Sequence, residues 1–227
     1  MFKCFSSNCN KGGDVIKFTK EFYNLSSTYE AVRMLANKYN IAIDESEIQS
    51  YLTVIDIRAK AAEYYHNVLF ENSSALKYFK EERQHSLEVI KRFKLGYSDG
   101  KLTIYLRGLG FKVVDIKKAG LCIGGTQDFI GKGQYIYPYF RLGIISHLRA
   151  KLRDPKRVYE TKSDSKCLFY NQDAVNEYDE AILVEGEDDL ITIVDKTDMG
   201  NVTAIGGNLK NKQISYVKIL KLKRLYL

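Results

Sequence analysis

Apolar residues recur at the spacing of an α-helix through much of the first half of the chain. Ser27 and Glu30 form the pattern of a capping box, and the apolar positions that follow predict an amphipathic helix reaching Tyr39. The mixed polar stretch 41–51 is interpreted as a linker. The same periodicity predicts further helices over residues 54–70, 75–80 and 86–93.

Strand patterns dominate the second half of the chain. Residues 135–139 and 143–148 are rich in Tyr, Ile and Phe, and residues 181–184 are a short, fully apolar run typical of a buried parallel strand. The remaining predicted elements are helices over 188–194 and around 211–220, and strands over 202–205 and 223–227. This β-α-β-α-β order predicts a three-stranded, mostly parallel sheet, so the fold class is α+β with an α/β C-terminal part.

Composition narrows the class of protein. Hydrophobic residues make up 45% and charged residues 28% of the 227 positions, which is typical of a globular protein with a core. No apolar run reaches the length of a membrane-spanning helix, so no membrane partner is expected. The start of the chain lacks an apolar signal segment, which favours a cytoplasmic location. Four cysteines in such a chain argue against a disulfide framework.

The net charge of +7 is unevenly distributed. Residues 141–157 carry six basic side chains and one acid, residues 176–198 carry nine acids and one lysine, and residues 208–227 carry six basic side chains and no acid. Two interpretations stay open: these runs are solvated faces of helices, or the basic runs bind a polyanion such as nucleic acid.

The acidic turn, residues 185–189, carries the clearest chemistry. Glu185 follows the apolar strand directly, at the end of the strand where open α/β sheets bind ligands. Gly186 permits a sharp turn, and Asp189 falls near the start of the next helix. Two carboxylates placed there could bind Mg²⁺. The alternative is a polar strand-to-helix turn whose acids favour the helix N-terminus.

Residues 183–191 resemble the first motif of the Toprim fold, in which a Glu-Gly pair is followed three residues later by Asp. Toprim sheets occur in bacterial DnaG-type primases, topoisomerases and related nucleases. Upstream residues are similar to the polymerase core of the primases, in the same order along residues 75–227. These segments are 92–97, the KAGL sequence 118–121, Tyr137 with Pro138, Arg149 with 154–156, and 168–171.

The resemblance implies roles for individual residues. Glu185 corresponds to the catalytic glutamate that works with Mg²⁺ or Mn²⁺ in nucleotidyl transfer, and Asp189 to its neighbouring metal-binding acid. Where the family has an arginine four residues before the proline of its strand, this chain has Gln134. The residues implied to contact nucleic acid or nucleotide are Arg149, Arg153, Lys156 and, as a substitute for the missing arginine, Lys132.

Cys4 and Cys9, followed by Gly12, Gly13 and an apolar helix, resemble the second half of the primase zinc ribbon. A structural zinc site needs four ligands. The family's first ligand pair would lie upstream of Met1, so we expect a half zinc site and little bound Zn²⁺. Cys122 and Cys167 are interpreted as small buried hydrophobic residues.

The expected organisation is a partial zinc ribbon with a helix over 1–45, a helical linker over 46–72, the N-terminal part of the primase core over 73–175 and a partial Toprim subdomain over 176–227. The resemblance implies a DNA primase that makes short RNA primers on single-stranded DNA from nucleoside triphosphates, with a replicative helicase as a candidate partner.

A truncated primase is expected, because the second acidic motif of a Toprim site would follow the last predicted strand. The divergence of the chain from the family pattern is the basis for expecting a phage-like primase. The 227-residue chain alone is therefore expected to be inactive. The alternatives are a non-catalytic nucleic-acid-binding remnant and a Toprim-type nuclease.

Overall fold

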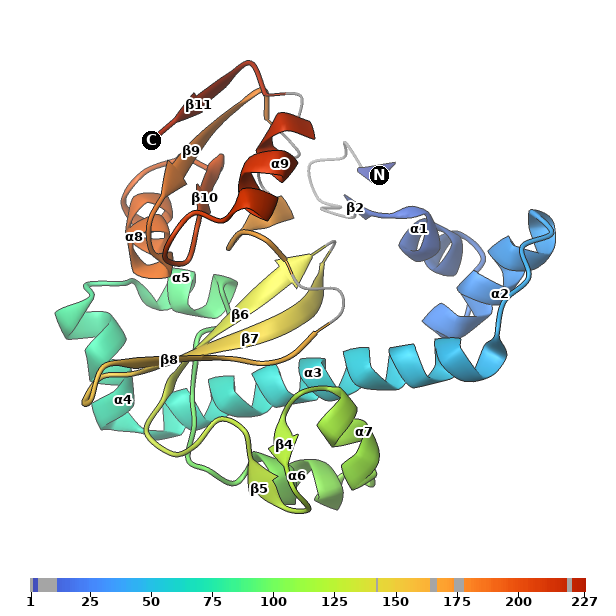
Figure 1. Ribbon diagram of the computed structural model, residues 1–227, viewed down its shortest axis with the longest axis horizontal. Helices are drawn as coiled ribbons and strands as arrows, with labels where there is room; N and C mark the ends of the chain where they lie inside the picture. The colour runs from blue at the N-terminus through green and yellow to red at the C-terminus, as the bar shows by residue number, and fades with distance from the viewer. Residues whose placement is uncertain (1, 4–11, 142, 164–166, 174–177, 220–221) are drawn as a thin grey trace. The chain divides into compact units, whose positions relative to one another are not determined.

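The computed structural model describes residues 2–3, 12–141, 143–163, 167–173, 178–219 and 222–227 (Figure 1). The chain divides into two compact units, Met1–Asp56 and Ile57–Leu227, which are described separately below as unit 1 and unit 2. None of the helices in these described ranges is long and apolar enough to cross a membrane.

Unit 1 is a short antiparallel strand pair followed by helices. Its elements are β1 (Phe2–Lys3), β2 (Gly12–Gly13), α1 (Val15–Phe22), α2 (Thr28–Lys38) and the first part of α3 (Glu45–Glu71). The predicted helix start is confirmed, since the Ser27 hydroxyl accepts the Glu30 N–H at 3.2 Å. The Glu30 carboxylate reaches back to the N–H of Ser26 rather than to that of Ser27, at 2.9 Å.

Helix α3 begins earlier than predicted, so the interpretation of 41–51 as a linker is wrong. The carboxylate of Asp44 accepts the backbone N–H groups of Ser46 and Glu47 at 2.8 and 3.2 Å, which satisfies donors that a helix start leaves free. Glu45 and Glu47 add negative charge in the first turn, where the helix dipole favours it. These capping signals outweigh the weak apolar periodicity of this stretch.

Unit 2 contains the second part of α3 and all later elements. Its helices are α4 (Ser73–Lys77), the π-helical turn η1 (Tyr78–Glu82), α5 (Leu87–Arg92), α6 (Leu102–Gly108), α7 (Val113–Lys118), α8 (Glu187–Lys196) and α9 (Asn211–Ile219). Its strands are β3 (Gly96–Tyr97), β4 (Cys122–Ile123), β5 (Gln127–Asp128), β6 (Tyr135–Arg141), β7 (Ile144–Leu152), β8 (Arg157–Glu160), β9 (Glu180–Val184), β10 (Val202–Ala204) and β11 (Arg224–Tyr226).

Two main sheets organise unit 2 (Figure 1). Strands β3, β6, β7 and β8 form an antiparallel sheet in the order β3-β6-β7-β8. The predicted three-stranded parallel sheet is confirmed, with β9 in the centre between β10 and β11. Both faces of β9 carry apolar side chains, and Ala181 and Leu183 are buried, as expected for the central strand of a parallel sheet.

The core of unit 2 is rich in aromatic side chains and lies between the antiparallel sheet, α5 and α8. Tyr137, Tyr170 and Phe79 are fully or almost fully buried. The rings of Tyr139 and Tyr170 meet edge to face with centroids 4.9 Å apart. Tyrosines bury a large apolar ring and still carry a hydroxyl, and two of these hydroxyls reach the start of α8.

Candidate functional site

The peptide group between Glu185 and Gly186 is held by hydrogen bonds at both its carbonyl oxygen and its N–H. The carbonyl oxygen of Glu185 accepts the N–H groups of Gly206 and Gly207, at 2.9 and 3.2 Å, from the loop after β10. The Asp189 carboxylate accepts the Gly186 N–H at 3.0 Å. A Cβ at Gly186 would lie 2.9 Å from Asp189 Oδ2, so glycine lets this carboxylate close over the turn.

The four acids of the turn point in two directions. Glu185 and Asp189 are exposed, whereas Glu187 and Asp188 are buried. The buried pair lies on the side of α8 that faces β6 and β7, as the contacts below show. Only the exposed pair can therefore reach a ligand that arrives from solvent.

Glu187 is held by two cations and a tyrosine. Its Oε1 accepts from Arg149 Nη1 at 2.9 Å and from the Tyr139 hydroxyl at 2.6 Å, and its Oε2 lies 3.0 Å from Lys151 Nζ. Burial alone would raise the pKa of Glu187, but Lys151, Arg149 and the Tyr139 hydrogen bond together lower it below its ordinary value. The carboxylate is therefore ionised and paired at neutral pH.

Asp188 has its own set of partners. The Tyr137 hydroxyl donates to Oδ1 at 2.8 Å and Lys151 Nζ to Oδ2 at 2.9 Å. The His85 ring and the Arg83 guanidinium lie 3.6 and 3.7 Å from the same carboxylate. Burial opposes ionisation of Asp188, but His85, Lys151 and Arg83 outweigh it and hold the pKa of this carboxyl well below its usual range.

The exposed pair fits a magnesium ion only in part. Mg²⁺ is usually bound through one or two carboxylates, with waters and substrate phosphates completing six oxygen ligands. Glu185 and Asp189 supply two carboxylates at the carboxyl end of β9. Across the described ranges, no group of three or more His, Cys, Asp or Glu side chains is placed to hold a metal.

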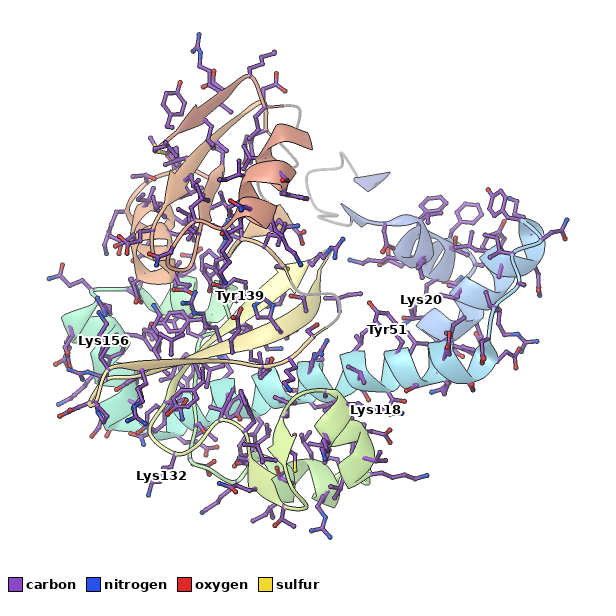
Figure 2. All side chains as sticks on the ribbon, viewed as in Figure 1. Lys20, Tyr51, Lys118, Lys132, Tyr139 and Lys156 are labelled. Atoms are coloured by element: carbon purple, nitrogen blue, oxygen red, sulfur yellow. The ribbon has the colours of Figure 1, made fainter. Side chains whose placement is uncertain are left out.

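The predicted nucleic-acid contacts do not form one cluster. Arg149 is largely buried behind the acidic turn, with 15% of its side chain exposed. Arg153 is exposed but makes a two-point contact with Glu82, at 3.0 and 2.8 Å. Lys156 and Lys132 are exposed in the loops before β8 and β6 (Figure 2). The structure thus brings Arg149, but not the two loop lysines, into the network that holds the turn.

The cysteines fall into two groups. Cys4 and Cys9 lie outside the described residues. Cys122 and Cys167 are both free and buried, which agrees with their interpretation as small hydrophobic residues. Burial raises the pKa of the Cys167 thiol to about 11, so it stays protonated near neutral pH.

Comparison with known proteins shows which proteins this chain is similar to. Residues 1–51 match the CHC2 zinc finger family, the zinc ribbon of DnaG. A DNA primase of Synechocystis sp. is 31% identical over 248 residues, which covers 94% of this chain and 38% of that protein. A DNA primase of Clostridium acetobutylicum is 28% identical over 240 residues, which covers 96% of this chain and 40% of that protein. Along most of its length, the chain is thus similar to bacterial DNA primases, and its first 51 residues are similar to the zinc ribbon of DnaG.

Solved primase structures share the fold. The zinc-binding and RNA polymerase domains of the Aquifex aeolicus primase align with a TM-score of 0.69 at 24% identity, covering 99% of this chain and 58% of that chain. The RNA polymerase domain of Mycobacterium tuberculosis DnaG, in complex with a double-stranded DNA oligomer that has a 6-nucleotide overhang, aligns with a TM-score of 0.66 at 19% identity, covering 74% of this chain and 59% of that chain. The chain spans about two fifths of the length of the curated primases that it matches.

The primase motifs include Arg149 and Tyr137 but do not indicate that these residues hold the turn. The motifs do not include Lys151 and Tyr139, and from the sequence Glu187 is only one member of an acidic run. A signal was present, because residues two apart on a strand share a face. Tyr137 and Tyr139 on β6 therefore form one pair and Arg149 and Lys151 on β7 another, and Tyr137 lies directly opposite Arg149.

Proposed function

We propose that this chain forms the zinc-ribbon part and the first part of the polymerase core of a DNA primase, which copies single-stranded DNA into short RNA primers. The observation that carries the proposal is the position of Glu185. It is exposed at the carboxyl end of the central parallel strand, directly before α8, in a chain that aligns with primases over 94–96% of its length. We interpret β9, β10 and β11 with α8 and α9 as the beginning of a Toprim-type sheet.

Glu185 and Asp189 are the proposed ligands of Mg²⁺ or Mn²⁺. When bound, the metal would neutralise charge on the phosphate oxygens of a nucleoside triphosphate. The role of the chain is to present the two carboxylates to solvent, with the Glu185 backbone fixed by Gly206 and Gly207. Because Mg²⁺ at one or two carboxylates keeps several of its waters and relies on substrate phosphates for further ligands, we expect weak metal binding and no primer synthesis by the 227-residue chain alone.

The other ligands follow from exposed charge and from the ribbon. Lys156, Lys132 and Arg153 are the proposed contacts to template phosphates, since they are exposed basic side chains. Cys4 and Cys9 are the proposed zinc ligands within this chain. Nucleoside triphosphates are the proposed substrates, and a replicative helicase is a candidate partner of the whole protein.

Three measurements on the 227-residue chain test the proposal. Fluorescence anisotropy with a labelled single-stranded oligonucleotide should show binding that weakens as salt rises, and K156Q should weaken it further. Paramagnetic resonance titration with Mn²⁺ should show binding that E185Q and D189N reduce. E88Q, which changes an exposed glutamate on α5, is the matched control and should leave Mn²⁺ binding unchanged. Incubation with template and labelled ribonucleotides should yield no primers.

The outcomes separate primase chemistry from a second candidate function. A non-catalytic nucleic-acid-binding role is favoured by one observation, that among the described residues Glu185 and Asp189 are not part of any group of three or more His, Cys, Asp or Glu side chains placed to hold a metal. If the chain binds DNA and E185Q leaves its Mn²⁺ affinity unchanged, the non-catalytic role is supported and the metal site at Glu185 is contradicted. Metal-dependent primer synthesis abolished by E185Q would confirm nucleotidyl transfer and overturn the expectation that this chain is inactive.

A further inference from the structure

Arg149 connects three segments that meet behind the acidic turn. Its Nη1 donates to Glu187 Oε1 at 2.9 Å, to the Tyr139 hydroxyl at 3.3 Å and to the carbonyl oxygen of Gly206. Strand β7 carries Arg149, β6 carries Tyr139 and the loop after β10 carries Gly206. Most of the Arg149 side chain is buried, and Nη1 makes all three of these contacts.

Two routes lead from Arg149 to Glu185. Along the first, the Gly206 carbonyl accepts from Arg149 while the N–H of the same residue donates to the Glu185 carbonyl at 2.9 Å. Along the second, Arg149 holds Glu187, the first residue of α8, which lies two residues after Glu185. The carbonyl of Glu185 and the first residue of α8 are thus both tied to one side chain.

Gly206 makes the first route possible. Its φ is +72°, which favours glycine, and a Cβ there would overlap Arg149 Nη1 and the Tyr139 hydroxyl. Lys151 completes the arrangement by pairing with the second oxygen of Glu187 at 3.0 Å. The buried acids are thereby balanced by partly buried cations, and the exposed Glu185 is left to meet a ligand.

We propose that Arg149 is a positioning residue that fixes Glu185 through Gly206 and Glu187, and that it does not contact the template or nucleotide. The assignment rests on the proposed metal site at Glu185. It differs from the role that family resemblance implies for Arg149, because here Nη1 is paired with Glu187 and most of the side chain is buried.

The central experiment measures Mn²⁺ affinity of the 227-residue chain without nucleic acid, in wild type, R149K and E187D. Both variants keep the charge near the site, so a change in affinity reports geometry rather than Coulomb attraction. Because residues that orient metal ligands typically change metal affinity by tenfold or more, we expect R149K and E187D each to weaken Mn²⁺ binding about tenfold. R107Q, at an exposed arginine of α6, is the control and should match wild type.

Hydrogen exchange supplies a readout that needs no metal. In R149K the amides of Gly206 and Gly207, which donate to the Glu185 carbonyl, should exchange faster, while the amides of β7 and β8 keep their protection. That pattern separates a loosened turn from a chain that has failed to fold. Unchanged exchange at both glycines would overturn the proposal.

DNA binding supplies the opposing test. R149Q should leave the salt dependence of single-stranded DNA binding unchanged, since the arginine is paired within the protein. Removing one phosphate contact reduces the magnitude of the slope of log K against log salt by about 0.7. We expect this reduction for K156Q. A lower slope in R149Q with normal Mn²⁺ affinity in R149K would assign Arg149 to the template and refute the positioning role.

The reference variant E185Q separates failure of this proposal from failure of the proposed function. If E185Q weakens Mn²⁺ binding and R149K does not, the metal site stands and the positioning role is wrong. If E185Q has no effect, the proposed metal site is wrong, and the positioning role falls with it.

Discussion

At the scale of single residues, the acidic turn shows what a sequence pattern can predict. Local signals were enough to place Glu185 at a strand end and Asp189 in the first helical turn, and the structure puts both there. The burial of Glu187 and Asp188 could not be predicted in this way. It depends on two cations of β7, Arg149 and Lys151, which lie 38 and 37 residues from their partners in the turn and contact them through the tertiary fold.

Lys151 allows a direct measurement of that burial. Its Nζ contacts both Glu187 and Asp188, so K151M leaves two buried carboxylates with fewer positive partners. Breaking a buried ion pair costs about 3–5 kcal/mol, and because this lysine keeps some exposure we expect K151M to lower the free energy of unfolding by about 2–3 kcal/mol. Urea unfolding followed by circular dichroism measures the change.

Two companion variants make this result specific. K156M removes an exposed loop lysine and should change the free energy of unfolding by less than about 0.5 kcal/mol. K151M/D188N also neutralises one of the two carboxylates that K151M leaves without this lysine. The double variant should therefore recover part of the lost free energy of unfolding. If K151M were as stable as wild type, the buried charges would not depend on this lysine.

At the scale of elements, long-range packing explains where prediction and structure differ. The helix predicted over 75–80 is instead α4 followed by the π-helical turn η1, which buries Tyr78 and Phe79 in the core. A periodicity of 3.6 residues cannot indicate a π-helical turn, because this turn depends on how the aromatic rings pack in the core. The strands 135–139 and 143–148 were predicted well but extend to Arg141 and Leu152 in the structure, through pairing with each other and with β8.

The contact between α5 and α8 yields a pH-dependent prediction. Asp195 on α8 accepts the Ser86 N–H at 2.9 Å and the Ser86 hydroxyl. Burial alone would raise the pKa of Asp195, but the bonds from Ser86 and the charge of Lys196 lower it. A lowered pKa in the folded state stabilises the protein above the unfolded value, near 4, and this contribution is lost as pH falls through the folded pKa.

D195N tests this contribution. At pH 7 the variant loses hydrogen bonds to a charged acceptor, and we expect it to be less stable than wild type by about 1 kcal/mol. The difference should shrink towards zero as the pH falls and the wild-type carboxyl becomes protonated. Urea unfolding at several pH values between 7 and 2.5 measures it, with D198N as the exposed control. A difference that stayed constant with pH would contradict the assigned role of the carboxylate.

At the scale of the whole chain, the three charged runs pair with one another inside unit 2. Arg149 and Lys151 of the first basic run contact the acidic run at α8. Lys223 and Arg224 of the second basic run contact Asp179 and Glu180 beside β9, at 2.5 and 3.3 Å. The charged runs therefore have a third role, besides forming solvated faces or binding a polyanion. Their opposite charges neutralise one another between elements that lie far apart in the sequence.

The two compact units give the last prediction. The core of unit 2 uses α3 only from Ile57 onward, with Tyr65 and Leu69 fully buried. A fragment of residues 45–227 keeps α3 whole and should fold without the ribbon. Since about 1 kcal/mol shifts the midpoint of a domain of this size by 2–4 °C, we expect the thermal midpoint of the core transition to stay within about 4 °C of that of the full chain. Near-ultraviolet circular dichroism of the buried tyrosines measures it.

A shorter fragment makes this test decisive. Residues 85–227 lack Tyr65 and Leu69 of α3 and Phe79 of η1. Three large, fully buried side chains are therefore missing from this fragment. Because deleting a single large core side chain already costs about 3–5 kcal/mol, this fragment should show no cooperative transition. If residues 45–227 also failed to unfold cooperatively, the core of unit 2 would depend on unit 1. The ion pairs around the acidic turn would then have to be studied in the full chain alone.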